Sequence, residues 1–259
     1  MDVEIDLNKS VDENAGIYYD LAKRAKKKLQ GAKDAIEDTK KKLAIVQKQE
    51  AAFWEEEEKK QVKKERKREW FEKFHWFTSS NGYLCVGGKD ATSNEIVIKK
   101  HMEKEDIVFH TEAPGSPFFL VKNGLNAPAT TLDETAQAVA IYSKAWKFGH
   151  TVAEVFYVNP EQVTKEAKSG EYISKGSFMV YGKKNFLHPK VECAIGSVEG
   201  RTIGGPVNAI KKQTTNYVII LPGEEKKSSL AKKIVHKLKG GEMDEVMAFL
   251  PAGEGRLEK

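Results

Sequence analysis

Cysteine is scarce in this chain. Only Cys85 and Cys193 occur among its 259 residues, and neither belongs to a CxxC pair. Because each lies in an apolar, strand-like setting, we expect two buried thiols in a protein from a reducing compartment, with a disulfide as the alternative. The six histidines lack the HxxxH and HExxH spacings that place two imidazoles on one helical face for zinc. The sequence therefore predicts no metal site and no cofactor.

Long apolar runs are also missing. No segment approaches the roughly 20 apolar residues that a membrane-spanning helix needs. The N-terminal sequence MDVEIDLNKS lacks the basic and then apolar order of a signal peptide. We therefore expect a cytoplasmic protein without a membrane partner. Charged residues make up 31% of the chain, but the net charge is only +5, so basic residues must cluster locally to bind a polyanion.

The patterns that mark common active sites are absent as well. The sequence GGK at positions 87–89 lacks the GxxxxGKS or GxxxxGKT spacing that wraps backbone N–H groups around a nucleotide. His110, Glu112 and Ser116 suggest a hydrolase, but the chain has no GxSxG turn. A histidine on a strand is more often a hydrogen-bonded structural residue than a catalyst. We expect no catalytic residue and no small-molecule substrate.

Three oxygen-bearing side chains leave a nuclease open as an alternative. Asp90, Asn94 and Glu95 carry the hard ligands that Mg²⁺ prefers. The same residues are explained more simply if Asp90 and Asn94 cap their own backbone in a turn between two strands. We favour the cap.

The first part of the chain has the pattern of a long helix. Its apolar residues recur at alternating steps of three and four, which keeps one seam of a helix facing a partner helix. The seam consists of Ala15, Tyr18, Ala22, Ala25, Leu29, Ala32, Ile36, Thr39, Leu43 and Val46. A charged segment of similar length follows, so residues 1–76 are predicted to form an antiparallel coiled-coil hairpin that closes near residues 47–51. Pairing with a second chain is the alternative.

Beyond residue 76 the pattern becomes typical of strands. Alternating β-branched and aromatic residues predict strands in EIVIKKHM (95–102), at 107–110, in PFFLVK (117–122), and at 152–158, 177–181 and 217–221. A capping box of Thr131 and Glu134 predicts the start of one helix, and a second is expected from about residue 228. The predicted fold is α+β: a long antiparallel helical coiled-coil hairpin followed by a mixed α/β globular domain.

Basic residues near aromatic ones are the candidates for nucleic-acid binding. Lys183 and Lys184 lie in a loop between Tyr181 and Phe186, which offers charge for phosphates and flat faces for bases. An ordinary exposed turn flanked by core aromatics is the alternative. The predicted phosphate contacts are Lys89, Lys99, Lys100, Lys122, Lys175, Lys183 and Lys184.

Several segments, in order, resemble one family. VEIDLNKSVDENAGIYYDLAKRAKKK and KREWFEKFHWF resemble the two ends of a coiled-coil arm, and GYLCVGGKDATSNEIVIKKHM with DIVFHTEAPGSPFFLVKN resembles the NFACT-R pattern. The motif positions are Gly87, Gly88, Asp90, Asn94, Glu95, His110, Gly115 and Ser116. The chain thus resembles the C-terminal part of the NFACT ribosome quality-control factors of the RqcH and NEMF type, in their archaeal and eukaryotic branch. The family is also known as fibronectin-binding protein A-like.

The resemblance implies a factor without an active site of its own. It implies binding to large ribosomal subunits that still hold peptidyl-tRNA, through rRNA and stalk-base proteins, and tRNA recruitment for C-terminal tailing of the nascent chain. Residues 77–190 would be the RNA-binding NFACT-R domain, and residues 191–259 an α/β extension packed on it. Family members normally begin with an NFACT-N domain, so we expect an excised fragment or a split gene. The alternative is a scaffold whose coiled coil docks a ribosomal protein or a ubiquitin ligase.

Overall fold

The structure, a computed structural model, describes residues 3–65, 69–166 and 174–258, with the backbone alone for residues 51–65. The chain divides into two compact units, Met1–Arg68 and Glu69–Lys259. The first is called the arm below and the second the head. The predicted domain boundaries at residues 76 and 190 are not tested by this division and stay predictions.

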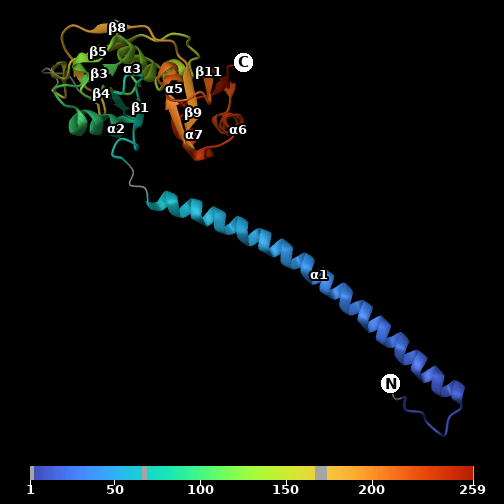
Figure 1. The fold of residues 1–259 in the computed structure, drawn as a ribbon. Coiled ribbons are helices and arrows are strands. Elements are labelled where there is room, and N and C mark those ends of the chain that lie inside the picture. The colour runs from blue at the N-terminus through green and yellow to red at the C-terminus, as the bar shows by residue number, and fades with distance from the viewer. Residues whose placement is uncertain (1–2, 66–68, 167–173, 259) are drawn as a thin grey trace. The chain divides into compact units, whose positions relative to one another are not determined.

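The arm is one long helix, α1 (Val11–Glu65), drawn without a break in Figure 1. Ser10 begins it with a reciprocal cap, because its hydroxyl accepts from the backbone N–H of Glu13 at 3.2 Å and its own N–H donates to the Glu13 carboxylate at 2.8 Å. The predicted long helical arm is confirmed, but the hairpin turn at residues 47–51 is not formed. The sequence QKQEA at these positions contains no glycine or proline and favours a helix interior.

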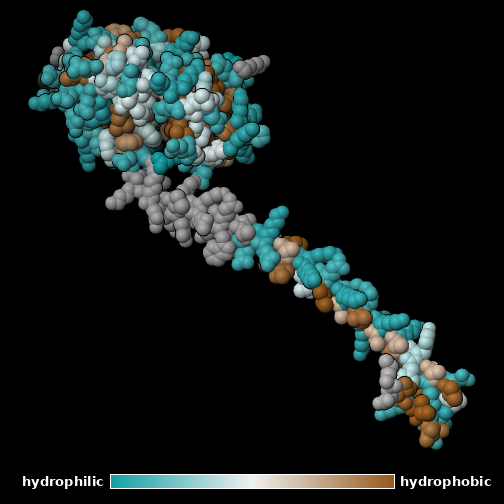
Figure 2. Space-filling view, viewed as in Figure 1, coloured by the Kyte–Doolittle hydropathy of each residue, from teal (hydrophilic) through white to brown (hydrophobic). Residues whose placement is uncertain are grey.

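Without a returning arm, the apolar seam of α1 is uncovered in the part of the arm whose side chains are described. Leu29, Ile36 and Leu43 are each between 57 and 58% exposed. Apolar residues recur along the visible side of this helix in Figure 2.

The head is built on a six-stranded antiparallel sheet, called the first sheet below. Its strand order is β1-β2-β4-β3-β5-β8. The strands are β1 (His75–Thr78), β2 (Leu84–Gly87), β4 (Phe119–Val121), β3 (Ile107–His110), β5 (Val155–Val158) and β8 (Asn185–Leu187). The strands predicted at 107–110, within 117–122 and within 152–158 are confirmed.

Both faces of the first sheet are buried. Cys85, Phe109 and Phe119 belong to one core cluster, whereas their chain neighbours Val86 and Leu120 belong to another. Because successive side chains point to opposite faces of a strand, a sheet with two apolar faces needs a cover on each side.

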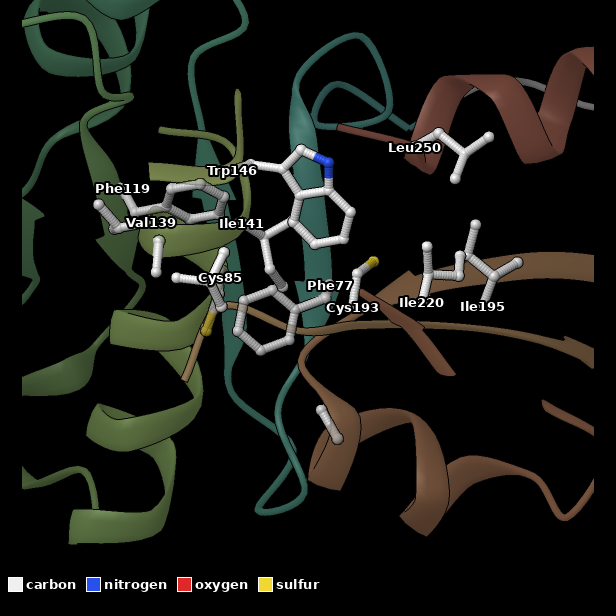
Figure 3. Close-up of a cluster of buried hydrophobic side chains, with 14 of the residues drawn as sticks. Phe77, Cys85, Phe119, Val139, Ile141, Trp146, Cys193, Ile195, Ile220 and Leu250 are labelled. Carbon is white, nitrogen blue, oxygen red and sulfur yellow. The ribbon is translucent and has the colours of Figure 1, made fainter. Parts of the chain in front are cut away.

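A helix and a second sheet cover the first of these faces. The helix α3 (Ala129–Ile141) packs on β3, β4 and β5. The second sheet has the order β10-β9-β11-β12, with β10 (Arg201–Gly205), β9 (Cys193–Val198), β11 (Tyr217–Glu225) and β12 (Gly255–Leu257). The helices α5 (Val207–Gln213), α6 (Lys227–Leu238) and α7 (Met243–Phe249) pack on it. Figure 3 shows side chains of the two sheets in one shared core.

The second face is covered by a helical segment that we predicted to be a strand. EIVIKKHM lies in α2 (Ala91–Ile96) and the π-helical turn η1 (Val97–His101), so the strand prediction is wrong. Val97 and Ile98 are buried against the second face of the first sheet, next to Val86 and Leu120. Their β-branched side chains favour a strand locally, but burial against the sheet prevails over this weak preference.

Smaller elements complete the head. The remaining described elements are η2 (Gly124–Asn126), α4 (Lys144–Lys147), η3 (Pro160–Gln162), β6 (Val163–Thr164) and β7 (Met179–Val180).

Pro128 occupies the N-cap position of α3, so the predicted capping box of Thr131 and Glu134 is wrong. Both residues are buried and bond the turn after β1, where the backbone N–H of Ser80 donates to the Glu134 carboxylate at 2.9 Å.

The close approach at Gly88 yields the first prediction. A Cβ there would lie 2.6 Å from the backbone nitrogen of Asn94 and overlap its side-chain oxygen. Gly88→Ala should therefore lower the free energy of unfolding by roughly 2 kcal/mol or more, measured by urea denaturation. Gly240→Ala is the control, because a Cβ at Gly240 meets open space. Equal effects of the two substitutions would contradict this account.

Candidate nucleic-acid interface

A cavity of about 500 Å³ opens at the end of the first sheet where β2 and β3 finish and β4 begins. Its walls come from the loop after β2, the loop between β3 and β4, and the segment around β7. The lining residues are 88–91, 94, 110–112, 114–118, 142, 156, 175–180 and 184. Segments far apart in the sequence therefore meet at one site.

The glycine turn of the motif is required by packing. A Cβ at Gly87 would enter the ring of Phe119, and one at Gly88 would collide with Asn94. The side-chain oxygen of Asn94 accepts from the backbone N–H of Phe118 at 3.1 Å, which ties the loop after β2 to the start of β4. These three motif positions build the cavity wall.

Asp90 caps its own backbone as predicted, but it does so at the start of the helix α2 and not in a turn between two strands, and Asn94 bonds Phe118 instead. Its carboxylate accepts from the backbone N–H of Ser93 at 2.8 Å. The hydrogen bonds from the backbone and hydroxyl of Ser93 hold the pKa of Asp90 below its ordinary value. Glu95 instead forms an ion pair with Lys99 at 2.6 Å on the outside of the helix. Of the residues that the structure describes, no three His, Cys, Asp or Glu side chains group closely enough to hold a metal ion.

His110 is a half-buried residue of the cavity wall. Its ring stacks on Phe118 at a centroid distance of 4.0 Å, and Nδ1 lies 2.6 Å from the carbonyl oxygen of Thr111. Burial lowers the pKa of His110 to about 4, so the ring is neutral at pH 7 and its Nδ1–H donates to that carbonyl. The Ser116 hydroxyl lies 2.7 Å from the Thr111 hydroxyl, inside the same loop. Gly115, also in this loop, has a positive φ of 96°.

Aromatic rings form the inner wall of the cavity. Phe118 and Phe156 are buried, and Phe178 meets Phe118 edge to face at 5.4 Å. The Lys184 ammonium lies 4.6 Å from the ring centroid of Phe156 and 2.7 Å from the Glu112 carboxylate. The cavity thus combines an apolar wall with charged groups at its edge.

The structure brings only part of the predicted lysine set together. Lys89, Lys175 and Lys184 line the cavity, and Lys183 precedes Lys184 in the same loop. Lys99 and Lys100 are exposed on η1, outside the lining. Tyr181 and Phe186, the aromatics predicted to flank the loop lysines, are also outside the lining, and the Lys184 ammonium lies over the ring of Phe156 instead.

Lys122 has a different environment from the other six lysines. Its ammonium lies 2.7 Å from the carboxylate of Asp106, which is fully buried, and donates to the carbonyl of His101 at 2.6 Å. The Asp106 carboxylate also accepts from the backbone N–H groups of Glu103 and Asn123. This network joins the end of η1 to β4 inside the protein, away from the cavity.

Several residues of the cavity were not identified from the sequence. Phe118, Phe156 and Phe178 were seen only as parts of predicted strands, and Tyr142 as part of a helix. A signal was available for Phe178, because it lies three residues after Lys175 in a segment rich in serine and glycine. For Phe156 and Tyr142 the sequence offers no such signal, since only the fold brings them to the cavity.

Lys122 gives a prediction about stability. Lys122→Met leaves the Asp106 carboxylate buried without its cation and should lower the free energy of unfolding by about 3 kcal/mol. The matched control Lys99→Met removes an exposed ion pair and should change it by less than about 1 kcal/mol. Urea denaturation at pH 7 measures both. A loss for Lys122→Met as small as that for Lys99→Met would show that the pair is not needed for folding.

Two half-buried histidines, His75 and His110, predict an acid dependence of stability. The pKa of His110 falls to about 4, and burial together with the charges of Lys89 and Lys227 lowers that of His75 to about 3, from an ordinary value of 6.5. The unfolded chain then binds more protons than the folded one below pH 6.5. Stability is therefore fully present above that pH and should decline as the pH falls toward 4. His110→Asn should make this decline shallower in a series of denaturant titrations. An unchanged decline would contradict the assignment to this residue.

Comparison with known proteins places this geometry in a family. Residues 73–182 match the model of the NFACT protein RNA binding domain. The archaeal Rqc2 homolog aRqcH of Methanocaldococcus jannaschii is 35% identical over 74% of this chain and 29% of its own length. The ribosome quality control complex subunit NEMF homolog of Drosophila melanogaster is 38% identical over 71% of this chain and 18% of its own length. Human NEMF is 39% identical over 68% of this chain and 16% of its own length.

These relatives are much longer, since the matched part is less than a third of each. Among the described residues, no helix is both long and apolar enough to cross a membrane. The cavity with its motif residues lies almost wholly within the part that matches the domain model. The chain belongs to the NFACT family, of the RqcH and NEMF type, with its NFACT-R domain at residues 73–182.

Proposed function

We propose that this chain is a non-enzymatic RNA-binding module that acts on the ribosome. The observation that carries the proposal is the cavity, where Lys89 and Lys175 border an apolar wall. No carboxylate lies within ion-pair distance of either lysine among the described residues. Lysines that lack a partner in the protein can neutralise RNA phosphates.

The acidic groups at the cavity are already engaged. Asp90 caps α2, and Glu112 is paired with Lys184. Asp90 keeps its negative charge and interacts with Lys175, so the lining, with three lysines and two carboxylates, has a net charge of +1, which favours a polyanion over a cationic partner. Lys89, Lys175 and Lys183 are the proposed phosphate contacts, and Lys184 joins them if RNA displaces Glu112. Lys122 is left out because its charge is used inside the protein.

A catalytic reading of the same residues has less support. His110 donates through Nδ1 to a backbone carbonyl rather than to an acidic side chain, and its ring is packed flat on Phe118. The Ser116 hydroxyl is bonded to Thr111 instead of to the histidine. This geometry lacks the base-to-nucleophile contact that an activated serine requires. A structural role for these motif residues accounts for every contact described above.

The names of the relatives direct the proposal to the ribosome. They are ribosome quality control complex subunits and an archaeal homolog of one. By extension, the protein to which this sequence belongs would bind large subunits that hold peptidyl-tRNA and would support tRNA recruitment for tailing of the nascent chain. The head would supply part of the RNA contact and the arm would extend its reach.

Charge reversal at the cavity tests the proposal. In Lys89→Glu/Lys175→Glu, binding to purified large subunits should weaken at least tenfold, that is by about 1.4 kcal/mol. The plot of log affinity against log salt should become shallower by roughly 0.7 per lost phosphate contact for single-stranded RNA. Pelleting across a salt series measures both. The control Lys232→Glu/Lys237→Glu makes the same charge change on exposed positions of α6, outside the cavity. Equal losses in the two variants would indicate a general charge effect and contradict the site.

The uncovered seam of α1 favours a second candidate, a scaffold whose arm docks a ribosomal protein or a ubiquitin ligase. Apolar residues that stay half exposed along a helix commonly serve as a contact surface. The same pelleting experiment separates the two functions. If the scaffold is correct, deletion of residues 20–70 abolishes binding while the cavity variant still binds.

A further inference from the structure

The cavity is larger than phosphate contact requires, and aromatic rings form part of its otherwise polar wall. Phosphates are bound by exposed cations on a surface, whereas this site is hollowed to about 500 Å³, within the range of pockets that enclose a small organic group. Its inner wall contains Phe118, Phe156 and Pro117, all buried. A site with both rings and polar groups in its wall is suited to a flat group with polar edges that is attached to an anion.

We propose that the cavity receives one unstacked base of single-stranded RNA, while Lys89 and Lys175 contact the phosphates on either side of it. This inference rests on the proposed RNA-binding function and specifies its ligand. In a duplex every base is stacked and paired, so only the phosphates could reach the site. In a single strand or loop a base can turn out and enter.

Phe178 is the ring best placed to stack on that base. It lines the cavity, is partly exposed, and is held edge-on by the buried Phe118. The Lys165 ammonium lies 4.9 Å from the Phe178 ring centroid and donates to the carbonyls of Ser174 and Ser177. The same lysine thus bonds the backbone just before Phe178 and lies over one face of its ring, and these contacts hold the ring in place. A ring held in advance loses little conformational freedom on stacking.

Phe118 also contacts His110, and at this part of the wall the cavity carries no charge. His110 is neutral at pH 7 because burial lowers its pKa to about 4, and it packs flat on Phe118. The charged groups lie instead near the opening, where Lys89 and Lys175 are exposed. This separation of an apolar interior from a cationic rim matches the arrangement of base and phosphate in a nucleotide. Stacking tolerates any base, so the site is expected to bind without strong sequence preference.

The test compares two RNA probes with the full chain by fluorescence anisotropy. One probe is an unstructured single strand of about 12 nucleotides, within the range of known single-strand sites; the other is the perfect duplex of the same sequence. The wild-type chain should prefer the single strand. Phe178→Ala should weaken single-strand binding roughly tenfold, the scale of one lost base–aromatic stack. It should leave duplex binding and the salt dependence unchanged, because no phosphate contact is removed.

Two further variants protect the test against a folding defect. Phe178→Leu keeps apolar volume without the flat ring and should show the same loss, whereas Phe178→Trp should bind as well as the wild type. Phe148→Ala is the matched control, since Phe148 is 65% exposed and outside the cavity. Thermal denaturation of each variant verifies the fold.

The outcomes separate this inference from the proposed function. If the chain binds both probes equally and Phe178→Leu binds like the wild type, the base site is wrong while RNA binding stands. If the wild-type chain binds neither probe, both are wrong. A single strand that carries 2-aminopurine should change its fluorescence on binding to the wild type, because the base leaves its stack in the RNA, and should change it less with Phe178→Leu. Equal changes with both proteins would also overturn the inference.

Discussion

The organisation of the head depends on the burial of the first sheet on both of its faces. A strand whose alternate side chains are all apolar cannot leave either face in water, and here α3 with the second sheet covers one face while α2 and η1 cover the other. To reach the second face, the chain must turn sharply after β2. That turn uses Gly87 and Gly88, which allow backbone and rings to approach closely. The cavity is formed where this turn meets the loop after β3.

The parts of the fold that could be predicted are those with a clear local pattern. The strands at 107–110 and 217–221 are short runs of apolar and aromatic residues. In the long helix, apolar residues recur every three or four positions. EIVIKKHM was misassigned because its β-branched residues favour a strand, although Asp90 with Ser93 was a recognisable helix start. The hairpin was inferred from the need to cover the seam, and that need does not by itself create a turn. In the continuous helix, the apolar seam of residues 11–50 has no cover.

The candidate site could be predicted only in part, for a reason of geometry. Lys89 and Lys122 are both lysines next to a strand end, and sequence alone does not distinguish them. They differ because the buried carboxylate of Asp106 forms an ion pair with Lys122 and not with Lys89. Likewise, the loop containing His110, the segment of Phe178 and the turn at Gly88 are separated by tens of residues and meet only in the folded sheet. Most positions of the family motif, by contrast, line or support this one cavity.

Three glycines around the cavity, of which two belong to the motif, have a consequence for how related proteins should be compared. Gly87 and Gly88 are needed for packing, and Gly176 has a φ of 78° with a Cβ position only 2.5 Å from the backbone of Ala91. A relative that had lost its ligand would still need all three to fold. A search pattern built on these glycines would therefore find proteins with the same fold. A pattern built on Lys89, Lys175 and Phe178 would find those with the same proposed RNA-binding residues. Proteins that satisfy the first pattern but not the second would be natural examples of this scaffold adapted to another task.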